Sequence, residues 1–270
     1  MAPPREIHFW HIPKTAGTSV AELIRRAYPP EECIPAHTVR ELIALRREEI
    51  PNYRCYTGHF FSLLEPLVTR RLPTVTILRD PFQQSLSLLR HCQRHVRGAG
   101  WVAPLIARAM EFTWKNITAA RQSIEKAWCP VLMNNFQTRV LGSEIRLPQK
   151  LASNFYGMTY PFLEQSFCNP AVDMEAIFER AAARLESMAV VGTVERLGET
   201  LDQIFSILEV PVPTTIPHQN TSPAPARTIS PAIRELVERE NRYDLELYRL
   251  ATNLLERGKA SPPQDKPGGV

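Results

Sequence analysis

The sequence predicts an α/β fold in which a parallel sheet of about four to five strands is covered by helices on both faces. Short apolar runs alternate with helical patterns along the chain, which is typical of β-α units. Hydrophobic residues make up 44% of the 270 residues, which is enough for a sizeable core. Glycine (11) is scarce and proline (24) is abundant, but neither recurs with a short period, so a collagen-like chain is excluded.

The strands are predicted from short apolar runs bounded by polar residues or proline. A strand buried on both faces of a parallel sheet is expected to be apolar throughout rather than alternating. Three segments fit this description: Ile7–His11, Val75–Leu78 and Ala189–Val194. Tyr53–Thr57 (YRCYT) is a further candidate strand.

Helices are predicted where apolar residues recur at spacings of three and four. The helix after the third strand carries Pro81 in its first turn, where the missing N–H of proline is tolerated. A proline-rich segment, 211–231, precedes the last helix. The predicted helices cover Thr18–Tyr28, Thr38–Ile50, Phe60–Thr69, Pro81–His95, most of 101–141, Met174–Met188, Glu199–Leu208 and a long final helix with a stripe from Ile233 to Leu255.

The chain is predicted to form one domain. No change of composition marks a linker, so residues 1–257 are taken together, with a helical insertion at about 100–170. The polar tail, 258–270, is expected to be disordered. No apolar stretch is long enough for a secretory signal or a membrane span, so a soluble, cytoplasmic protein is expected.

Charge and cysteine content narrow the classes of ligand. The net charge of +4 suits an anionic small ligand better than a nucleic acid. The five cysteines are odd in number, widely spaced and without a C-x-x-C pair, which argues against a disulfide framework and a zinc site. We interpret them as free thiols of a reducing compartment. The sequence does not indicate an oligomeric state.

The first strand runs into a loop that opens a helix, which is the setting of a phosphate cradle. Backbone N–H groups and the positive end of the helix converge there, and hydroxyl groups and one lysine add donors and charge. The loop is P-loop-like but lacks the G-x-x-x-x-G-K-[ST] pattern, because the lysine precedes the glycine. The alternative is a helix capped by Thr18 or Ser19. The loop residues are Pro13, Lys14, Thr15, Ala16, Gly17, Thr18 and Ser19.

A second group of polar residues follows the third strand. Arg79 stands at the carboxyl end of that strand, where open α/β sheets bind ligands, and its planar guanidinium suits a phosphate. Ser87 lies two turns into the next helix and could face the same anion. The alternative is a surface pair of Arg79 and Asp80, with Ser87 filling the helix.

The segments HIPKTAGTS and LRDPF…S resemble the two nucleotide-binding motifs of the sulfotransferases, most closely those of the carbohydrate (heparan and uronyl) enzymes. That family uses 3′-phosphoadenosine 5′-phosphosulfate (PAPS) as sulfate donor. The resemblance implies that loop residues Lys14 to Ser19 bind the 5′-phosphosulfate, and that Arg79 and Ser87 bind the 3′-phosphate. Three further stretches are also similar: 135–139, 191–196 and 244–248.

The sequence departs from the family pattern inside the second motif. Gln84 stands where the family often has arginine, and Leu89 stands where it often has tyrosine. Eukaryotic members are typically anchored in the Golgi membrane. The lack of an anchor in this sequence favours a soluble enzyme.

Sulfuryl transfer needs a cation beside the bridging oxygen of the leaving phosphate and a base for the acceptor hydroxyl. Lys14 is the candidate cation. His59 is the candidate base, because it follows the second strand in a Gly-His pair like that of the family and titrates near neutral pH. His11 is the second candidate, and a loop histidine capping the next helix is the alternative for His59. This scheme needs no metal.

The proline-rich segment contains Arg227, which by analogy with a late loop of sulfotransferases contacts the 3′-phosphate; the alternative is a stiff connector. The predicted activity is transfer of a sulfuryl group from PAPS to a hydroxyl of a carbohydrate acceptor. Two alternatives stay open. One is a kinase with a variant phosphate loop, in which Asp80 would bind Mg²⁺. The other is a non-catalytic nucleotide-binding protein of the same fold.

Overall fold

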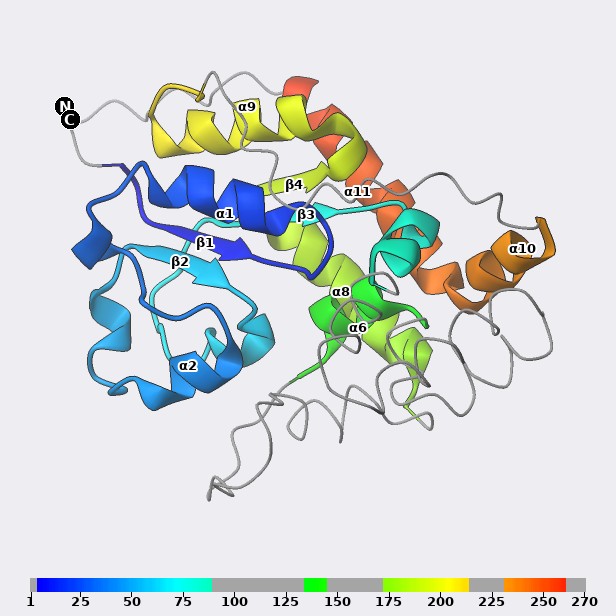
Figure 1. Cartoon of the computed structure of the whole chain (residues 1–270), viewed down its shortest axis with the longest axis horizontal. Helices are drawn as coiled ribbons and strands as arrows, with labels where there is room; N and C mark the ends of the chain where they lie inside the picture. The colour runs from blue at the N-terminus through cyan, green and yellow to red at the C-terminus, as the bar shows by residue number, and fades with distance from the viewer. Residues whose placement is uncertain (1–3, 89–133, 145–171, 214–230, 261–270) are drawn as a thin grey trace, which may run out of the picture.

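The computed structural model describes residues 4–88, 134–144, 172–213 and 231–260 (Figure 1). Within them, four strands form one sheet in the order β2-β1-β3-β4. All neighbouring strands are parallel, with Phe9 opposite both Thr57 and Val75, and Thr76 opposite Val191. The strands are β1 (Ile7–Trp10), β2 (Cys55–Gly58), β3 (Thr74–Leu78) and β4 (Val190–Thr193). The predicted α/β class and all four predicted strands are thereby confirmed, with ends shifted by one or two residues.

Helices cover both faces of the sheet, as Figure 1 shows. One face packs against α1 (Gly17–Arg25) and α9 (Leu197–Leu208), and its apolar core joins Phe9 of β1 to Leu23 and Phe205 of these helices. The other face packs against α6 (Phe136–Gly142), α8 (Met174–Ser187) and α11 (Arg242–Ala260). Because both faces are covered, every strand residue except the half-buried Thr74 is buried.

Two helices predicted from periodicity are shorter in the structure. The segment predicted as one helix from Thr38 to Ile50 contains α2 (Val39–Ala44) and the 3-10 turn η2 (Ile50–Asn52). A capping box of Thr38 and Glu41 starts α2, but extended backbone at Leu45 ends it. In the segment 60–69, only the 3-10 turn η3 (Phe61–Leu63) forms, and η1 (Pro30–Glu32) is a further turn.

The remaining described helices match the prediction more closely. Asp173 caps α8 by accepting from the backbone N–H of Ala176. The predicted long final helix is two helices, α10 (Pro231–Glu240) and α11, and α11 continues to Ala260 into the predicted tail. Residues 81–88 are helical, as predicted. The rest of that helix, most of the predicted insertion and residues 261–270 lie outside the described residues.

All four strands point the same way, so their carboxyl ends share one edge of the sheet. The loop before α1, the residues after β2 and the residues after β3 all leave from this edge, which positions the candidate site. Among the described helices, none combines the length and apolar character that crossing a membrane requires. Cys33 and Cys55 are both free thiols and both buried.

Candidate functional site

The loop between β1 and α1 has a backbone shape that its sequence did not reveal. Lys14 and Ala16 have left-handed backbone angles, with φ of 69° and 60°. Helix α1 begins at Gly17, and its capping position, Ala16, makes no side-chain hydrogen bond to the helix. The alternative in which Thr18 or Ser19 caps the helix is therefore wrong. The first turn of α1 keeps backbone N–H groups directed at the loop, as an anion cradle requires.

Hydrogen bonds from three side chains hold this loop in place. The buried Thr15 hydroxyl donates to the Ile12 carbonyl oxygen at 2.9 Å. Gln84 donates to the Pro13 carbonyl oxygen at 3.4 Å, and Arg79 Nη1 donates to the Lys14 carbonyl oxygen at 3.3 Å. Arg79 thus lies against the loop, so the two predicted nucleotide motifs meet at one place. Gln84, noted in the sequence only as a departure from the family, contributes to that meeting.

Two hydrogen bonds from the side chain of Gln137 in α6 hold the backbone of Arg79. Gln137 Oε1 accepts from the Arg79 N–H, and Gln137 Nε2 donates to the Arg79 carbonyl oxygen, both at 2.9 Å. The side-chain amide therefore pairs with Arg79 as a neighbouring strand would. Gln137 is itself fully buried, so its rotamer is fixed by packing.

Two carboxylates, the buried Asp244 and the exposed Glu195, complete the support on this side of the sheet. Asp244 of α11 accepts from the backbone N–H of Gln137 (3.1 Å) and of Thr138 (2.7 Å). Glu195 accepts from the Asp80 N–H (3.2 Å) and from the Tyr248 hydroxyl (2.8 Å). We call Gln137, Glu195 and Asp244 the β3 clamp. The three stretches that resemble the family outside the main motifs, 135–139, 191–196 and 244–248, each supply one of its members.

His59 follows β2 directly. It therefore lies at the same edge of the sheet as Arg79, but on the opposite side of β1. Its Nδ1 is 2.8 Å from the carbonyl oxygen of His11, and its backbone N–H donates to the carbonyl oxygen of His37 at 2.8 Å. A carbonyl oxygen only accepts, so Nδ1 carries the hydrogen. In the neutral ring, the lone pair is then on Nε2.

Burial and neighbouring positive charge keep this histidine neutral. The pKa of His59 is lowered from 6.5, first by desolvation and further by His37 and Lys14, against an opposing contribution from its bond to His11. The pKa of His11 lies well below 6.5, first because it is buried and then because of His59, His37 and Lys14. A neutral imidazole with a free Nε2 can accept a proton from a hydroxyl group.

The ring of His11 occupies the space that the missing side chain of Gly17 leaves. A Cβ at Gly17 would stand 1.9 Å from His11 Cδ2. The His11 ring also lies 4.0 Å, centroid to centroid, from the His59 ring. Gly17 was predicted to let the backbone approach an anion. Its additional role, found only in the structure, is to admit the histidine that anchors the candidate base.

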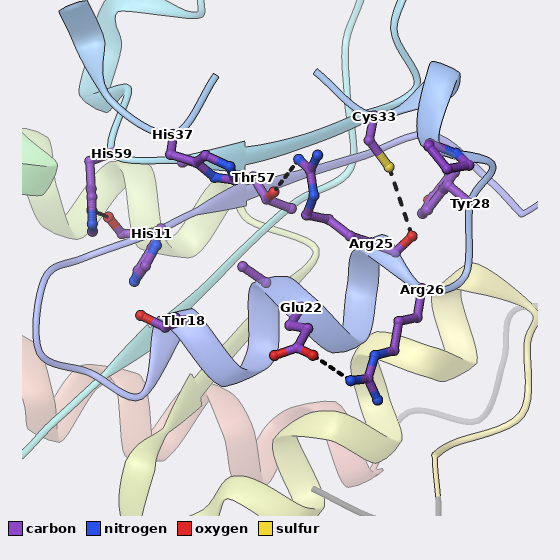
Figure 2. A pocket seen from close by; sticks show the side chains of 13 residues that line it. His11, Thr18, Glu22, Arg25, Arg26, Tyr28, Cys33, His37, Thr57 and His59 are labelled. Atoms are coloured by element: carbon purple, nitrogen blue, oxygen red, sulfur yellow. Dashed lines mark hydrogen bonds and ion pairs between the residues drawn. The ribbon is translucent and has the colours of Figure 1, made fainter. Parts of the chain in front are cut away.

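A cavity of about 590 Å³ opens between α1 and the end of β2, with the histidines at one end (Figure 2). Its wall includes Thr18, Glu22 and Arg25 from one face of α1 and Arg26, which caps the C-terminal end of that helix. We call this cavity the histidine pocket. The full lining is His11, Thr18, Ala21, Glu22, Arg25, Arg26, Tyr28, Pro30, Cys33, His37, Thr57, Gly58 and His59.

The structure brings most of the predicted site residues to this edge, but not all. Thr18 is exposed there, whereas Ser19 is buried. Ser87 is half-buried and makes no hydrogen bond to Arg79 or to the phosphate loop. Asp80 Oδ1 accepts from the Gln83 N–H and so caps the helix that follows. Arg227 lies outside the described residues.

His37 and Arg25 line the pocket but were not singled out from the sequence as site residues. Pairing His37 with His59 requires the bridge between Thr38 and His59, which is a long-range contact that no local pattern indicates.

Within the described residues, no group of three histidine, cysteine or carboxylate side chains is arranged to bind a metal ion. A scan against protein-family models gives no match, and a search of curated proteins also finds none. The resemblance to sulfotransferases therefore rests on the two motifs and on the residues that match them.

Proposed function

We propose that the protein is a PAPS-dependent O-sulfotransferase that acts on a hydroxyl group of a carbohydrate acceptor. One observation carries the proposal: a neutral histidine with a free Nε2 stands at the same sheet edge as a phosphate-type loop. The combination supports group transfer to a hydroxyl, since one part binds an anionic donor and the other removes the proton from the acceptor.

The residues on the donor side fit a molecule with phosphate groups at two places. Backbone N–H groups from Ala16 to Ser19 and the side chain of Lys14 would bind the 5′-phosphosulfate. Arg79 would bind the 3′-phosphate, and its backbone is fixed by Gln137. Ser87 is assigned to the same phosphate by the motif alone, and Arg227 by analogy with a late loop of sulfotransferases.

PAPS, when bound, supplies the sulfuryl group and a phosphate leaving group. His59 Nε2 accepts the proton of the acceptor hydroxyl as that oxygen forms its bond to sulfur. Lys14 stabilises the electron pair that stays on the bridging phosphate oxygen when the bond between that oxygen and sulfur breaks. The His11 carbonyl oxygen keeps the His59 ring oriented and bonds the Nδ1 hydrogen throughout, which also favours the protonated ring that forms.

Calorimetry with 3′-phosphoadenosine 5′-phosphate (PAP), with and without Mg²⁺, tests the donor side. We expect PAP to bind without Mg²⁺ and more tightly than ATP. A preference for ATP with strict dependence on Mg²⁺ would identify a kinase instead. Incubation with ³⁵S-labelled PAPS and a panel of sugars then tests transfer. Tight binding of PAP with no transfer to any acceptor would favour a non-catalytic nucleotide-binding protein.

A further inference from the structure

Cys33 and Cys55 lie opposite each other where the segment after η1 pairs with β2. They form a parallel bridge, beside which the Ile34 N–H donates to the Cys55 carbonyl oxygen at 3.0 Å. Neighbouring strands lie about 4.8 Å apart, and a disulfide joins residues whose Cα atoms are about 4.4–6.8 Å apart. Both thiols belong to the same apolar core, so their side chains lie on one face. The backbone therefore places the two sulfurs within reach of each other.

A hydrogen bond between the two thiols gives them different acidities. The Cys55 thiol donates to the Cys33 sulfur, and this bond is the main cause that lowers the pKa of Cys33 to about 7. Burial opposes the change, and the charge of Arg25 lowers the pKa of Cys33 further. The same hydrogen bond, together with burial, raises the pKa of Cys55. At neutral pH, Cys33 is therefore the thiol that supplies the nucleophilic thiolate, while Cys55 keeps its proton.

The two cysteines differ in their access to the histidine pocket. Cys33 is part of the pocket lining, whereas Cys55 is not. Figure 2 shows the Cys33 thiol directed at the Arg25 carbonyl oxygen, which accepts from it at 3.8 Å. Cys33 is 3% exposed and Cys55 is fully buried. A small reagent that enters the cavity therefore meets Cys33 first.

We propose that Cys33 and Cys55 are a modification site at which a hydroperoxide forms a reversible disulfide, with Cys33 as the attacking thiol and Cys55 as the resolving thiol. Both are free thiols in the structure, which is the reduced state of such a pair. Hydrogen peroxide is small enough to reach a sulfur that is almost buried. The inference does not depend on the proposed function, because none of its measurements uses PAPS.

The reaction takes two steps and consumes one molecule of peroxide. The Cys33 thiolate bonds to one peroxide oxygen as the O–O bond breaks, which leaves Cys33 as a sulfenic acid. The hydroxide that departs takes up the proton that Cys33 released on ionising. The Cys55 sulfur then bonds to the Cys33 sulfur as the S–O bond breaks, and the Cys55 proton leaves with the hydroxyl group as water. The two thiols are thereby oxidised, and the peroxide is reduced to water.

Peptide mapping of the full-length protein tests the disulfide. The protein is reduced, freed of reductant, treated with hydrogen peroxide, blocked with N-ethylmaleimide in urea and digested with trypsin. Trypsin places the two cysteines in separate peptides, 27–40 and 55–70. We expect these peptides to be joined, with a mass two hydrogen atoms below their sum, and dithiothreitol to separate them. Irreversible oxidation of Cys33 with Cys55 still free would overturn the proposal. So would a joined product that forms only when the protein is unfolded before peroxide is added.

The three other cysteines provide the control for this experiment. Cys92, Cys129 and Cys168 lie outside the described residues. A variant with serine at all three positions keeps the pair as its only cysteines and should give the same joined peptides. Loss of the product in this folded variant would show that another cysteine is the partner, and would overturn the proposal. Circular-dichroism melting of every variant confirms that it is folded.

Single substitutions in this triple-serine variant test the two roles. Cys55→Ser removes the resolving thiol but keeps a hydroxyl donor for Cys33, so dimedone, which traps sulfenic acids, should label Cys33 in the presence of peroxide. Cys55→Ala also removes the donor, and Cys33 should then be labelled several-fold more slowly. In Cys33→Ser, Cys55 should be labelled at least about tenfold more slowly than Cys33 is in Cys55→Ser. Equal labelling rates for Cys33 and Cys55 would overturn the assignment of an attacking and a resolving thiol.

Discussion

The two halves of the sheet edge are built on different principles. The histidine pocket at the ends of β1 and β2 contains titratable side chains oriented by backbone carbonyl oxygens, as His59 is by His11. The β3 clamp at the ends of β3 and β4 is the reverse, because buried side chains such as Gln137 orient backbone groups. A side chain held by backbone keeps its chemistry available. A backbone held by side chains is fixed in position.

Mutations in the two halves should therefore have different effects. A change in the histidine pocket should alter the reaction and leave donor affinity largely intact. A change in the β3 clamp should move Arg79, which lies against the phosphate loop, and so alter donor affinity. The experiments on His59, Gly17 and Gln137 measure turnover and PAP affinity side by side.

Removing the candidate base should give the largest effect. His59→Ala deletes the only pocket imidazole that we assign to proton transfer, so we expect turnover to fall by about 10²–10⁴-fold. PAP affinity should change little, because His59 stands on the acceptor side. Steady-state kinetics with ³⁵S-labelled PAPS and calorimetry with PAP provide the two numbers.

His37→Ala is the matched control for this experiment. His37 holds His59 through its backbone carbonyl oxygen, which the substitution keeps. Turnover in this variant should remain within a few-fold of wild type. A collapse of PAP affinity in His59→Ala would instead make His59 a nucleotide-binding or structural residue and would remove the distinction between the halves.

A methyl group at Gly17 should disturb the pocket through His11. The added Cβ would stand 1.9 Å from the His11 ring, so the ring must move, and with it the carbonyl anchor of His59. We expect Gly17→Ala to lower turnover by roughly 10²-fold, as a displacement near 1 Å can do. Gly198→Ala in α9 is the control, because nothing lies within 4 Å of a Cβ there.

Thermal melting should separate these two glycine variants. Gly17→Ala is expected to lose about 1–3 kcal/mol of stability through overpacking. Gly198→Ala should be neutral or gain up to about 1 kcal/mol, since alanine is the better helix former. Wild-type turnover in Gly17→Ala would show that the placement of His11 does not matter to the reaction.

Releasing Arg79 should give a smaller effect, and on affinity rather than turnover. Gln137→Ala removes both hydrogen bonds to the Arg79 backbone. We expect PAP affinity to fall about tenfold, the equivalent of one misplaced charged hydrogen bond, with turnover at saturating PAPS less affected. Gln83→Ala, on the exposed side of the adjacent helix, should change neither. An unchanged PAP affinity in Gln137→Ala would remove the clamp from the site.

The strands and the phosphate loop could be predicted because their signals are local. A short apolar run such as Val75–Leu78 usually forms a buried strand. The helices predicted at Thr38–Ile50 and Phe60–Thr69 came from the same kind of reasoning and were too long. Periodicity does not report that Leu45 takes an extended backbone, or that only a 3-10 turn forms at Phe61.

The β3 clamp could not be derived from the sequence, since its contacts join residues far apart in the chain. Gln137 and Arg79 are 58 residues apart, and Asp244 and Thr138 are 106 apart. The resemblance marked these stretches without giving them a role. Likewise, the sequence pointed to His59 as a base, but its orientation by the His11 carbonyl depends on the adjacent parallel positions of β1 and β2.

The two halves are also expected to respond to acid in opposite directions. Burial lowers the pKa of His11 and His59 below 6.5. As the pH falls below 6.5, the unfolded chain therefore takes up protons on these two residues before the folded chain does. The stability that the neutral histidines give the folded chain is lost over that fall in pH. Burial raises the pKa of Asp244 to about 6 from 3.8. The folded chain therefore takes up that proton first, and this contribution to stability increases as the pH falls.

Asp244→Asn removes the contribution of the Asp244 carboxyl to the pH dependence of stability and leaves that of His11 and His59. Between about pH 6 and pH 4, the free energy of unfolding of the variant should fall more steeply than that of wild type, by at most about 1.4 kcal/mol per pH unit. Urea unfolding followed by tryptophan fluorescence gives both curves, after correction for the lower stability of the variant at pH 8. Since Asp244 is ionised in both states above pH 7, the curves should run parallel there. Parallel curves down to pH 4 would mean that burial does not hold a proton on this carboxylate, and the β3 clamp would then lack the acid response that sets it apart from the histidine pocket.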